Sequence, residues 1–259
     1  MRVLGIETAT PLASCAVVDG SGVLAEAALR APMRHLEWLA PAIAEMLRGL
    51  GMRPAELEGI AVSRGPGGFT GLRIGIATAA AWARARRTPV LGVDTLEALA
   101  LAAGGPAVVL AALDAHRGEV AAGLYHVSAA GAPRCLVAPI VAPPDVVTAE
   151  VAAVLDGAPV GTADPPPVSE AHRRRGVGDP VLIVGDALVR HEQALLDGLA
   201  GRGVPGGPHM HPRAAAVGLL GRLRLLEGVR DDPETLLPVY GRRPALREWQ
   251  ETRVPPGNG

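Results

Sequence analysis

A glycine-rich stretch of thirteen residues, SRGPGGFTGLRIG at Ser63–Gly75, is the segment best suited to chemistry. It follows a short apolar run, Gly59–Val62, and leads into a helix-like run, Leu72–Arg86. Glycine lets the backbone adopt positive φ or approach another group closely, and the N–H groups at a helix start can hold an anion. Two interpretations therefore fit the stretch, a phosphate cradle and a tight structural turn.

The end of this loop does not match a P-loop. Gly71 is followed by Leu72, where a P-loop has lysine and then serine or threonine. Thr70 can cap the following helix, and Arg73 lies in its first turn. Arg73 could contact a phosphate or a partner's carboxylate, or it could be a solvated helix residue, and the sequence leaves both open.

No metal site is expected. Cys15 and Cys135 fit no metal-ligand spacing, and two cysteines form no disulfide framework, which favours a reduced, cytoplasmic compartment. His209 and His211 form a pair beside a proline but have no nearby carboxylate motif.

Composition limits the classes of function. The chain has 259 residues, of which 49% are hydrophobic and 2% aromatic, so its core must be built from aliphatic side chains. A net charge of −1 gives no strong attraction for nucleic acid or anionic membrane, so any work on RNA is expected to go through a partner. No uncharged apolar stretch approaches the ~20 residues of a membrane span, and the N-terminus does not resemble a signal peptide.

The first hundred residues predict three strands and a helix with a wide apolar surface. The strands are Arg2–Ile6, Ala13–Val18 and Val23–Leu29, and the helix runs from Pro32 to Leu50. Such a helix is sandwiched inside the protein or shared with a partner. The next helix, Leu72–Arg86, is rich in alanine and glycine, which allows another helix to approach closely.

The same order of elements recurs loosely after Gly104. Strands are predicted at Val108–Leu113, Glu119–His126 and Arg134–Val141, followed by a helix at Val146–Leu155. We take this as a sign of a duplicated fold. Residues 157–180, rich in proline and glycine, predict a flexible insertion whose Arg173–Arg175 run is solvated or touches RNA.

Several segments together carry a family resemblance. GIETAT, HLEWLAPAI, VSRGPGGFTGLRIGIATA, GVDTLEALA and LDAHRGEVAAGLY, in this order, resemble the TsaB family, also called YeaZ, over Met1–Tyr125 and weakly beyond. The resemblance implies a two-domain α/β fold like that of actin, Hsp70 and sugar kinases (RNase H-like), with a degenerate second domain. We expect an N-terminal domain at 1–103, completed by a helix at 211–228, a C-terminal domain at 104–210, and a disordered tail at 241–259.

The resemblance also implies a non-catalytic scaffold in the cytoplasm. TsaB-like chains pair with TsaD, the subunit that threonylcarbamoylates the adenosine beside the anticodon in certain tRNAs, and support the ATPase TsaE. The chain alone is expected to form a homodimer, to meet tRNA only through the complex, and to bind no membrane. The predicted partner-facing residues are Leu36, Leu39, Ile43, Leu72, Ile76 and Ala80.

Carried over residue by residue, the family's active-site positions look vestigial. The catalytic relative has two histidines four apart on the first helix, whereas this chain has His35 and Leu39, so His35 is interpreted as a helix-start residue near the subunit surface. Glu7 stands where the superfamily holds metal and nucleotide, and it is either a remnant of that site or part of a polar strand end, which we favour. The candidate vestigial nucleotide or phosphate residues are Glu7, Thr8, Thr10, Gly67, Gly68, Thr70 and Arg73.

Two enzymatic alternatives stay open beside the scaffold. An ATP-dependent small-molecule kinase would depend on Glu7 and on Asp114, which precedes Arg117 in a turn and is otherwise a turn-forming residue. A peptidase is the weaker alternative, because Ser14 and Ser63 have no accompanying His–Asp pair and no protease motif is present. No cofactor is expected, with residual ATP or ADP binding left open.

Overall fold

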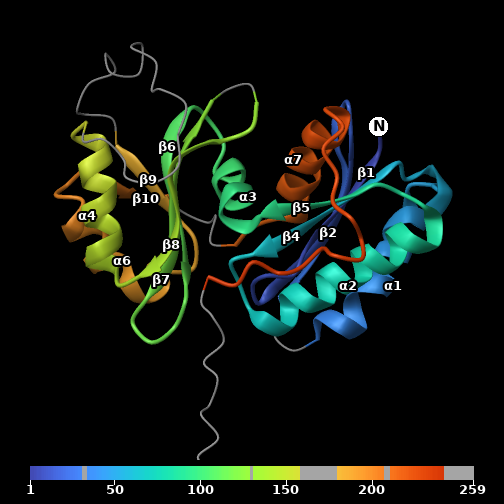
Figure 1. The fold of residues 1–259 in the computed structure, drawn as a ribbon, viewed down its shortest axis with the longest axis horizontal. Helices are drawn as coiled ribbons and strands as arrows, with labels where there is room; N and C mark the ends of the chain where they lie inside the picture. Colours follow the sequence, from blue (N-terminus) through green and yellow to red (C-terminus); the bar gives the residue numbers. More distant parts are fainter. Residues whose placement is uncertain (31–33, 129–130, 158–179, 207–210, 242–259) are drawn as a thin grey trace, which may run out of the picture.

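Two lobes lie side by side in the computed structural model, each built on a five-stranded sheet (Figure 1). The structure describes residues 1–30, 34–128, 131–157, 180–206 and 211–241. The predicted insertion at 157–180 and the predicted tail at 241–259 lie almost wholly outside these residues. No helix in the described ranges is long and apolar enough to cross a membrane.

The sheet of the first lobe has the strand order β3-β2-β1-β4-β5. A hairpin between β2 and β3 turns at Gly20 and Ser21, where the Ser21 N–H donates to Asp19 Oδ1 at 2.7 Å. Such short links make β1, β2 and β3 antiparallel, whereas helical crossovers make β4 and β5 parallel to β1. The strands are β1 (Val3–Glu7), β2 (Leu12–Asp19), β3 (Gly22–Arg30), β4 (Gly59–Gly65) and β5 (Val90–Asp94).

The second sheet, β10-β9-β6-β7-β8, repeats this order and these directions. Each sheet has three antiparallel strands and, beyond the first strand on one side, two strands parallel to it, which is the arrangement of an RNase H-like lobe. Two such lobes in tandem give the actin-like, sugar-kinase-like class. The predicted fold class and the duplication are therefore confirmed. The strands are β6 (Ala107–Asp114), β7 (Val120–Val127), β8 (Arg134–Ala142), β9 (Val181–Val184) and β10 (Gly203–Pro205).

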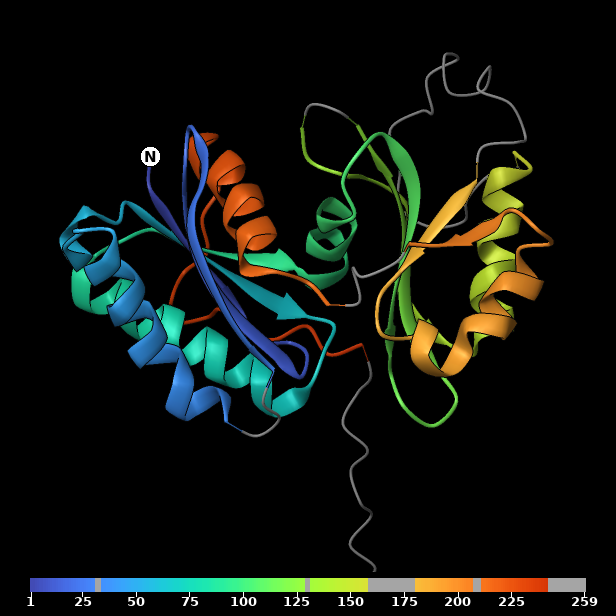
Figure 2. The same ribbon diagram turned by 180° about the vertical axis from the view of Figure 1, so that it is seen from behind.

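Helices cover both faces of the first sheet (Figures 1 and 2). On one face lie α1 (His35–Gly49) and α2 (Phe69–Arg86), and on the other lies α7 (Ala214–Leu226). A single turn of 3-10 helix, η1 (Pro54–Glu56), precedes β4. Gly5, Gly218 and Gly221 let α7 approach the sheet backbone closely, because a Cβ at any of them would crowd its neighbours.

The last helix of each half packs on the sheet of the other half. Thus α3 (Thr95–Ala102), which follows β5, lies against β6 and β7, with Leu96 and Leu99 fully buried. In return α7, which follows β10, covers β1, β2 and β4. The remaining face of the second sheet is covered by α4 (Pro144–Leu155) and α6 (Leu188–Gly198).

Four helix starts differ from the predictions: α1 begins at His35 rather than Pro32, α4 begins at Pro144 rather than Val146, and α2 and α7 each differ by three residues. The α2 helix begins at Phe69, three residues early, because Gly68 is its extended N-cap and the Gly68 carbonyl accepts the Leu72 N–H at 3.0 Å. The α7 helix begins at Ala214 rather than His211, since Arg213 is extended, with φ −126° and ψ 142°.

Candidate functional site

The glycine loop closes onto the turn that follows β1. The Gly68 N–H donates to the Ala9 carbonyl at 2.7 Å, and the Thr8 hydroxyl donates to the Gly71 carbonyl at 2.8 Å. A Cβ on Gly71 would overlap the Thr8 carbonyl, and one on Gly67 would overlap Ala9. The glycines are therefore required for close backbone approach, and two hydrogen bonds join the loop directly to the turn. This geometry favours the structural turn over the phosphate cradle.

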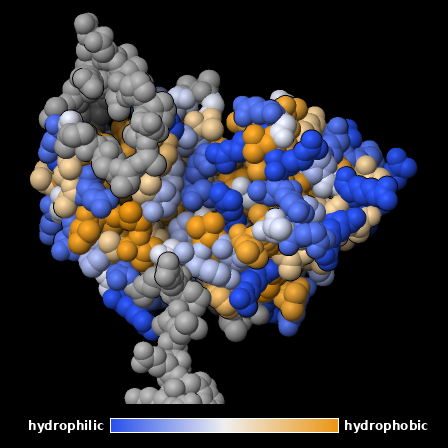
Figure 3. Space-filling view, in the orientation of Figure 1, coloured by the Kyte–Doolittle hydropathy of each residue, from blue (hydrophilic) through white to orange (hydrophobic). Residues whose placement is uncertain are grey.

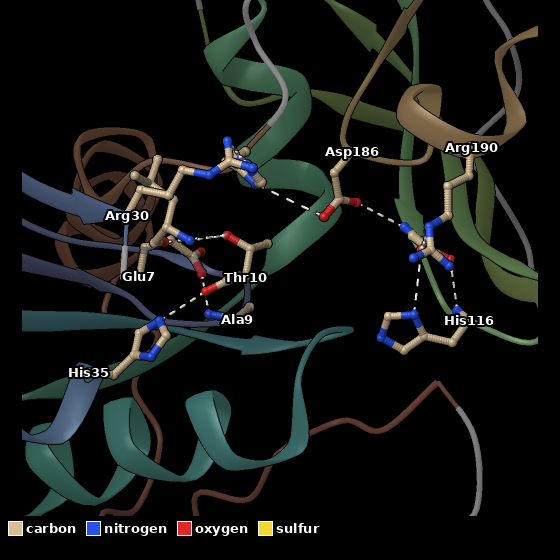
Figure 4. Close-up of polar contacts among 11 residues, drawn as sticks. Glu7, Ala9, Thr10, Arg30, His35, His116, Asp186 and Arg190 are labelled. Atoms are coloured by element: carbon tan, nitrogen blue, oxygen red, sulfur yellow. Dashed lines mark hydrogen bonds and ion pairs between the residues drawn. The ribbon is translucent and has the colours of Figure 1, made fainter. Parts of the chain in front are cut away.

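Glu7 ends β1 beneath this turn and is fully buried. Its Oε1 accepts the Ala9 N–H at 2.5 Å, as Figure 4 shows, and Oε2 has no hydrogen-bond partner among the described residues. Burial raises the pKa of Glu7 to about 7, and the hydrogen bond from Ala9 offsets this only in part. The described residues contain no group of three or more His, Cys, Asp or Glu that could hold a metal ion.

His35 is the first residue of α1 and is buried rather than near the surface, which corrects the prediction in part. Its Nε2 lies 3.0 Å from the Thr10 carbonyl, so the ring ties α1 to the β1–β2 turn (Figure 4). The Thr10 hydroxyl in turn bonds to the backbone of Leu12, at 3.3 Å. Both side chains therefore have structural partners, as the polar strand end predicts.

Arg73 is an exposed residue of α2, which agrees with one of its two predicted alternatives, whereas Thr70 differs from the prediction. The Arg73 guanidinium lies 3.8 Å from the centroid of the Phe69 ring, and its Nε donates to the Tyr240 hydroxyl at 3.1 Å. The Phe69 and Tyr240 rings are stacked, with centroids 5.0 Å apart. Thr70 does not cap α2, because the helix already begins at Phe69.

Four of the six predicted partner-facing side chains lie inside the chain's own core. Leu39, Ile43, Leu72 and Ile76 are at most 6% exposed and pack under the first sheet, which corrects the expectation that they face a partner. Their spacing does mark one helix face, but that face points inward. Ala80 is half-buried, and Leu36 is 71% exposed.

The outer side of the same two helices carries an apolar groove of about 530 Å³. It lies between the start of α1 and the length of α2, and its floor is made of small and aliphatic side chains. Figure 3 shows hydrophobic surface broken by hydrophilic residues over this lobe. The lining residues are Leu36, Phe69, Thr70, Arg73, Ile74, Ala77, Thr78 and Ala81.

Most of the few aromatic residues of this chain belong to the two helices or to the segment beside α2, and of these Phe69 lines the groove while Trp38 and Trp82 pack against the core. The sequence contains one Phe, two Tyr and three Trp, of which Trp249 lies outside the described residues. Four of the other five belong to α1, α2 or the segment that crosses α2, the exception being Tyr125 in β7. Aromatic and arginine side chains are enriched at protein interfaces. The four are Trp38, Phe69, Trp82 and Tyr240.

A second polar cluster, which the sequence did not reveal as a group, lies at the ends of β6 and β9. The Asp114 carboxylate has three basic neighbours, His116 at 3.4 Å, Arg190 at 3.5 Å and His191 at 3.7 Å. Asp186 accepts the Asp114 N–H at 2.8 Å, and Figure 4 shows its side chain between the two lobes. The only sequence signal for Asp186 is its place, after glycine at the end of a strand.

Asp114 also forms the predicted turn, since its Oδ1 accepts the His116 N–H at 2.8 Å.

His211 Nδ1 lies 4.0 Å from Asp186. Burial, and then the charge of Arg30, lowers the pKa of His211. His209 lies outside the described residues. The Ser14 hydroxyl accepts the Ala214 N–H at 2.9 Å, a structural role at the start of α7.

The comparisons with known proteins agree with this fold. The family model described as "TsaD: tRNA N6-adenosine threonylcarbamoyltransferase" matches residues 15–134. The Escherichia coli (strain K12) tRNA threonylcarbamoyladenosine biosynthesis protein TsaB is 39% identical over 123 residues, 46% of this chain and 53% of that protein. The Bacillus subtilis (strain 168) protein of the same name is 29% identical over 258 residues, 98% of this chain and 100% of that protein. The chain thus aligns with about half of one relative and the whole of the other.

A crystal structure of an uncharacterized Pseudomonas aeruginosa protein with similarity to peptidase YeaZ superposes with a TM-score of 0.73. It is 26% identical and covers 93% of this chain and 99% of its own. YeaZ from Pseudomonas aeruginosa gives a TM-score of 0.68 at 25% identity, covering 92% and 99%.

Fold and sequence thus define a two-lobed α/β protein with a duplicated RNase H-like core and a closed glycine loop. The TsaB-named relatives, the YeaZ structures and the TsaD-like family model together support the TsaB family, also called YeaZ, as the predicted resemblance indicated.

Proposed function

We propose that this chain is a non-catalytic scaffold in the biosynthesis of threonylcarbamoyladenosine in tRNA. It binds a TsaD-family subunit through the outer face of α1 and α2 and supports the action of the ATPase TsaE. The observation that carries the proposal is the apolar groove on that face, lined by Phe69 among others, in a chain whose relatives are named for this pathway. An apolar groove of this kind is stabilised by burial against another chain.

A TsaD-family subunit suits the groove because it shares ancestry with this chain. The TsaD family model matches residues 15–134, and both docking helices lie within that range. Two chains of one fold can present corresponding helices to each other in a pseudo-twofold arrangement. A second copy of this chain offers the same helices, so without its partner the chain is expected to form a homodimer.

The glycine loop of the first lobe and the polar cluster of the second lobe support the non-catalytic role. Hydrogen bonds between the loop and the turn already use the Thr8 hydroxyl, the Gly68 N–H and the Gly71 carbonyl. The two donors among them are therefore not free to hold a phosphate. Asp114, the base that a kinase would need, is instead surrounded by three basic side chains. With a net charge of −1, the chain is expected to reach tRNA through its partner.

A matched pair of substitutions tests the docking face. Ala77 lines the groove and Ala55 lies in η1, and both are exposed, so Ala77→Arg and Ala55→Arg make the same change at different places. We expect Ala77→Arg to weaken binding to the TsaD-family subunit of the same organism about 100-fold, since it buries a charge in an apolar contact. Ala55→Arg should bind as the wild type does. Calorimetric titration measures both, and wild-type affinity for Ala77→Arg would contradict the proposal.

The enzymatic alternative is tested with ATP and magnesium on the purified chain. The scaffold proposal expects no turnover, whether or not some nucleotide binding persists. Micromolar binding accompanied by turnover, and lost in Glu7→Gln and Asp114→Asn, would favour a kinase instead. Reconstituted tRNA modification with and without this chain then tests the pathway itself.

A further inference from the structure

The segment that follows α7, Asp231–Tyr240, crosses the first lobe as a strap with one turn near its start, drawn in red in Figure 1. At its start the Asp231 N–H donates to the Val90 carbonyl at 2.8 Å, and Asp231 Oδ2 accepts the Gly92 N–H at 2.7 Å. Leu236 is buried in the core shared with α1 and α2. The C-terminal strap is therefore anchored to β5 and to the core before it reaches the glycine loop.

The strap then runs beside α2 and reaches that loop in its second half. Glu234 pairs with Arg84 near the end of α2 at 3.0 Å, and on the loop the Val239 N–H donates to the Arg64 carbonyl at 2.6 Å. Gly65 faces the strap so closely that a Cβ there would overlap the Val239 carbonyl. The strap thus fixes the backbone just before α2 begins.

The strap ends at the groove. The Tyr240 ring stacks on Phe69 with an interplanar angle of 25°, and its hydroxyl accepts the hydrogen bond from Arg73. Phe69 and Arg73 line the groove, and Phe69 is 46% exposed. Tyr240 therefore holds in place two side chains that the proposed partner would meet first at this end of α2.

We propose that Tyr240 is a positioning residue for partner binding, and that the C-terminal strap preorganises the groove. Without Tyr240, Phe69 and Arg73 would each sample several rotamers and would have to be ordered when the partner docks, at a cost in affinity. This inference rests on the proposed function, because it assigns a determinant of affinity to the same docking face.

Three variants of the strap test it by calorimetric titration against the TsaD-family subunit. Tyr240→Ala removes the ring, Tyr240→Phe keeps the stack but loses the hydrogen bond, and Leu237→Ala alters an exposed strap residue as the control. We expect Tyr240→Ala to weaken binding roughly three- to tenfold, the range for one aromatic pair. Tyr240→Phe should lose less than Tyr240→Ala, and Leu237→Ala should bind as the wild type does.

Melting temperatures separate positioning from folding. The anchors at Asp231 and Leu236 remain in every variant, so Tyr240→Ala should melt near the wild-type temperature while its affinity falls. Phe69→Ala should weaken binding less in the Tyr240→Ala background than in the wild type, because the two rings act together.

The outcomes distinguish the two proposals. If Ala77→Arg abolishes binding while Tyr240→Ala binds as the wild type does, the role of the strap is wrong and the docking face stands. An equal loss in Tyr240→Ala and Leu237→Ala would also overturn the role of the ring. If Ala77→Arg leaves binding intact, the proposed function fails and the strap inference fails with it.

Discussion

The two lobes place the same residue types at the same points of their sheets and surround them differently. The first strand of each sheet ends in an acid, Glu7 in β1 and Asp114 in β6. A glycine with φ near +120° stands at the end of β4 and directly after β9, Gly65 at +122° and Gly185 at +120°. Yet Glu7 is sealed beneath the glycine loop, whereas Asp114 stays partly exposed among basic side chains.

The difference comes from the connecting segment after the fourth strand of each lobe. After Gly65 the chain builds a loop over the β1–β2 turn, and the C-terminal strap covers it. After Gly185 the chain enters α6 at Leu188, so no corresponding loop among the described residues covers Asp114. A repeated backbone thus specifies where an acid stands, and the connecting segments decide whether it is buried or solvated.

The largest expected effect tests the equivalence of the two glycines. Gly65→Ala and Gly185→Ala should each lower the free energy of unfolding by at least about 3 kcal/mol. Each puts a Cβ at a φ that side chains disfavour and into a carbonyl, that of Val239 or Ala112. Urea unfolding measures this, with Gly49→Ala as the control because nothing lies within 4 Å of its Cβ. A small effect at either glycine would break the comparison.

The next largest effect is the difference in stability loss between buried and exposed leucines of the helices that cover the two sheets. Leu39 in α1 and Leu195 in α6 are both fully buried, so alanine at either should cost about 3 kcal/mol of stability. Leu36→Ala should change stability by less than about 0.5 kcal/mol, since that side chain is exposed. If Leu36→Ala and Leu39→Ala lowered the free energy of unfolding equally, in thermal and chemical unfolding, the outer face of α1 would not be solvent-exposed as described.

Burial of Glu7 should make the stability of the protein depend on pH. Because burial raises the pKa of Glu7 from 4.5 to about 7, the folded state keeps a proton that the unfolded state releases. Stability should therefore fall as pH rises from about 4.5 to about 7, by up to about 3 kcal/mol from this group.

Glu7→Gln should remove that part of the slope and should be more stable than the wild type at pH 8 but not at pH 4.5. Asp114→Asn serves as the control and should leave this slope in place. Unfolding curves across the pH range measure the free energy of unfolding of each variant. Parallel wild-type and Glu7→Gln profiles would mean that Glu7 is not sealed.

The smallest effect concerns an exposed ion pair of the strap. Arg84 and Glu234 are both more than half exposed, so Arg84→Ala should lower stability by no more than about 1 kcal/mol. The loss should shrink further in 1 M salt, where the Debye length is ~3 Å. A larger loss would make this pair, and not Asp231 and Leu236, the main anchor of the strap.

The sequence predicted most strands and helices because their apolar periods are clear, and the glycine loop because glycine permits close approach. It could not predict which face of α1 points inward, since apolar residues occur on both the Leu36 and the Leu39 sides of the helix. Period 3.6 groups side chains onto a face but does not orient that face.

The strap and the polar cluster were missed for a different reason. Asp231–Tyr240 has no helix or strand period, so nothing local distinguishes it from a loose connection. Asp114 and Arg190 are 76 positions apart in the numbering and meet only because β6 and β9 pair in parallel. The domain boundaries stay predictions, as does the partner itself.

The reciprocal packing of α3 and α7 has a consequence for dissecting the molecule. A cut between residues 103 and 107 would part the two sheets, leaving α3 in a fragment without β6 and β7, and α7 in a fragment without β1, β2 and β4. Each fragment would then expose an uncovered apolar sheet face and would tend to aggregate or to recapture its missing half. Separate lobes would therefore require a circularly permuted gene that keeps α3 with β6 and β7, and α7 with β1, β2 and β4.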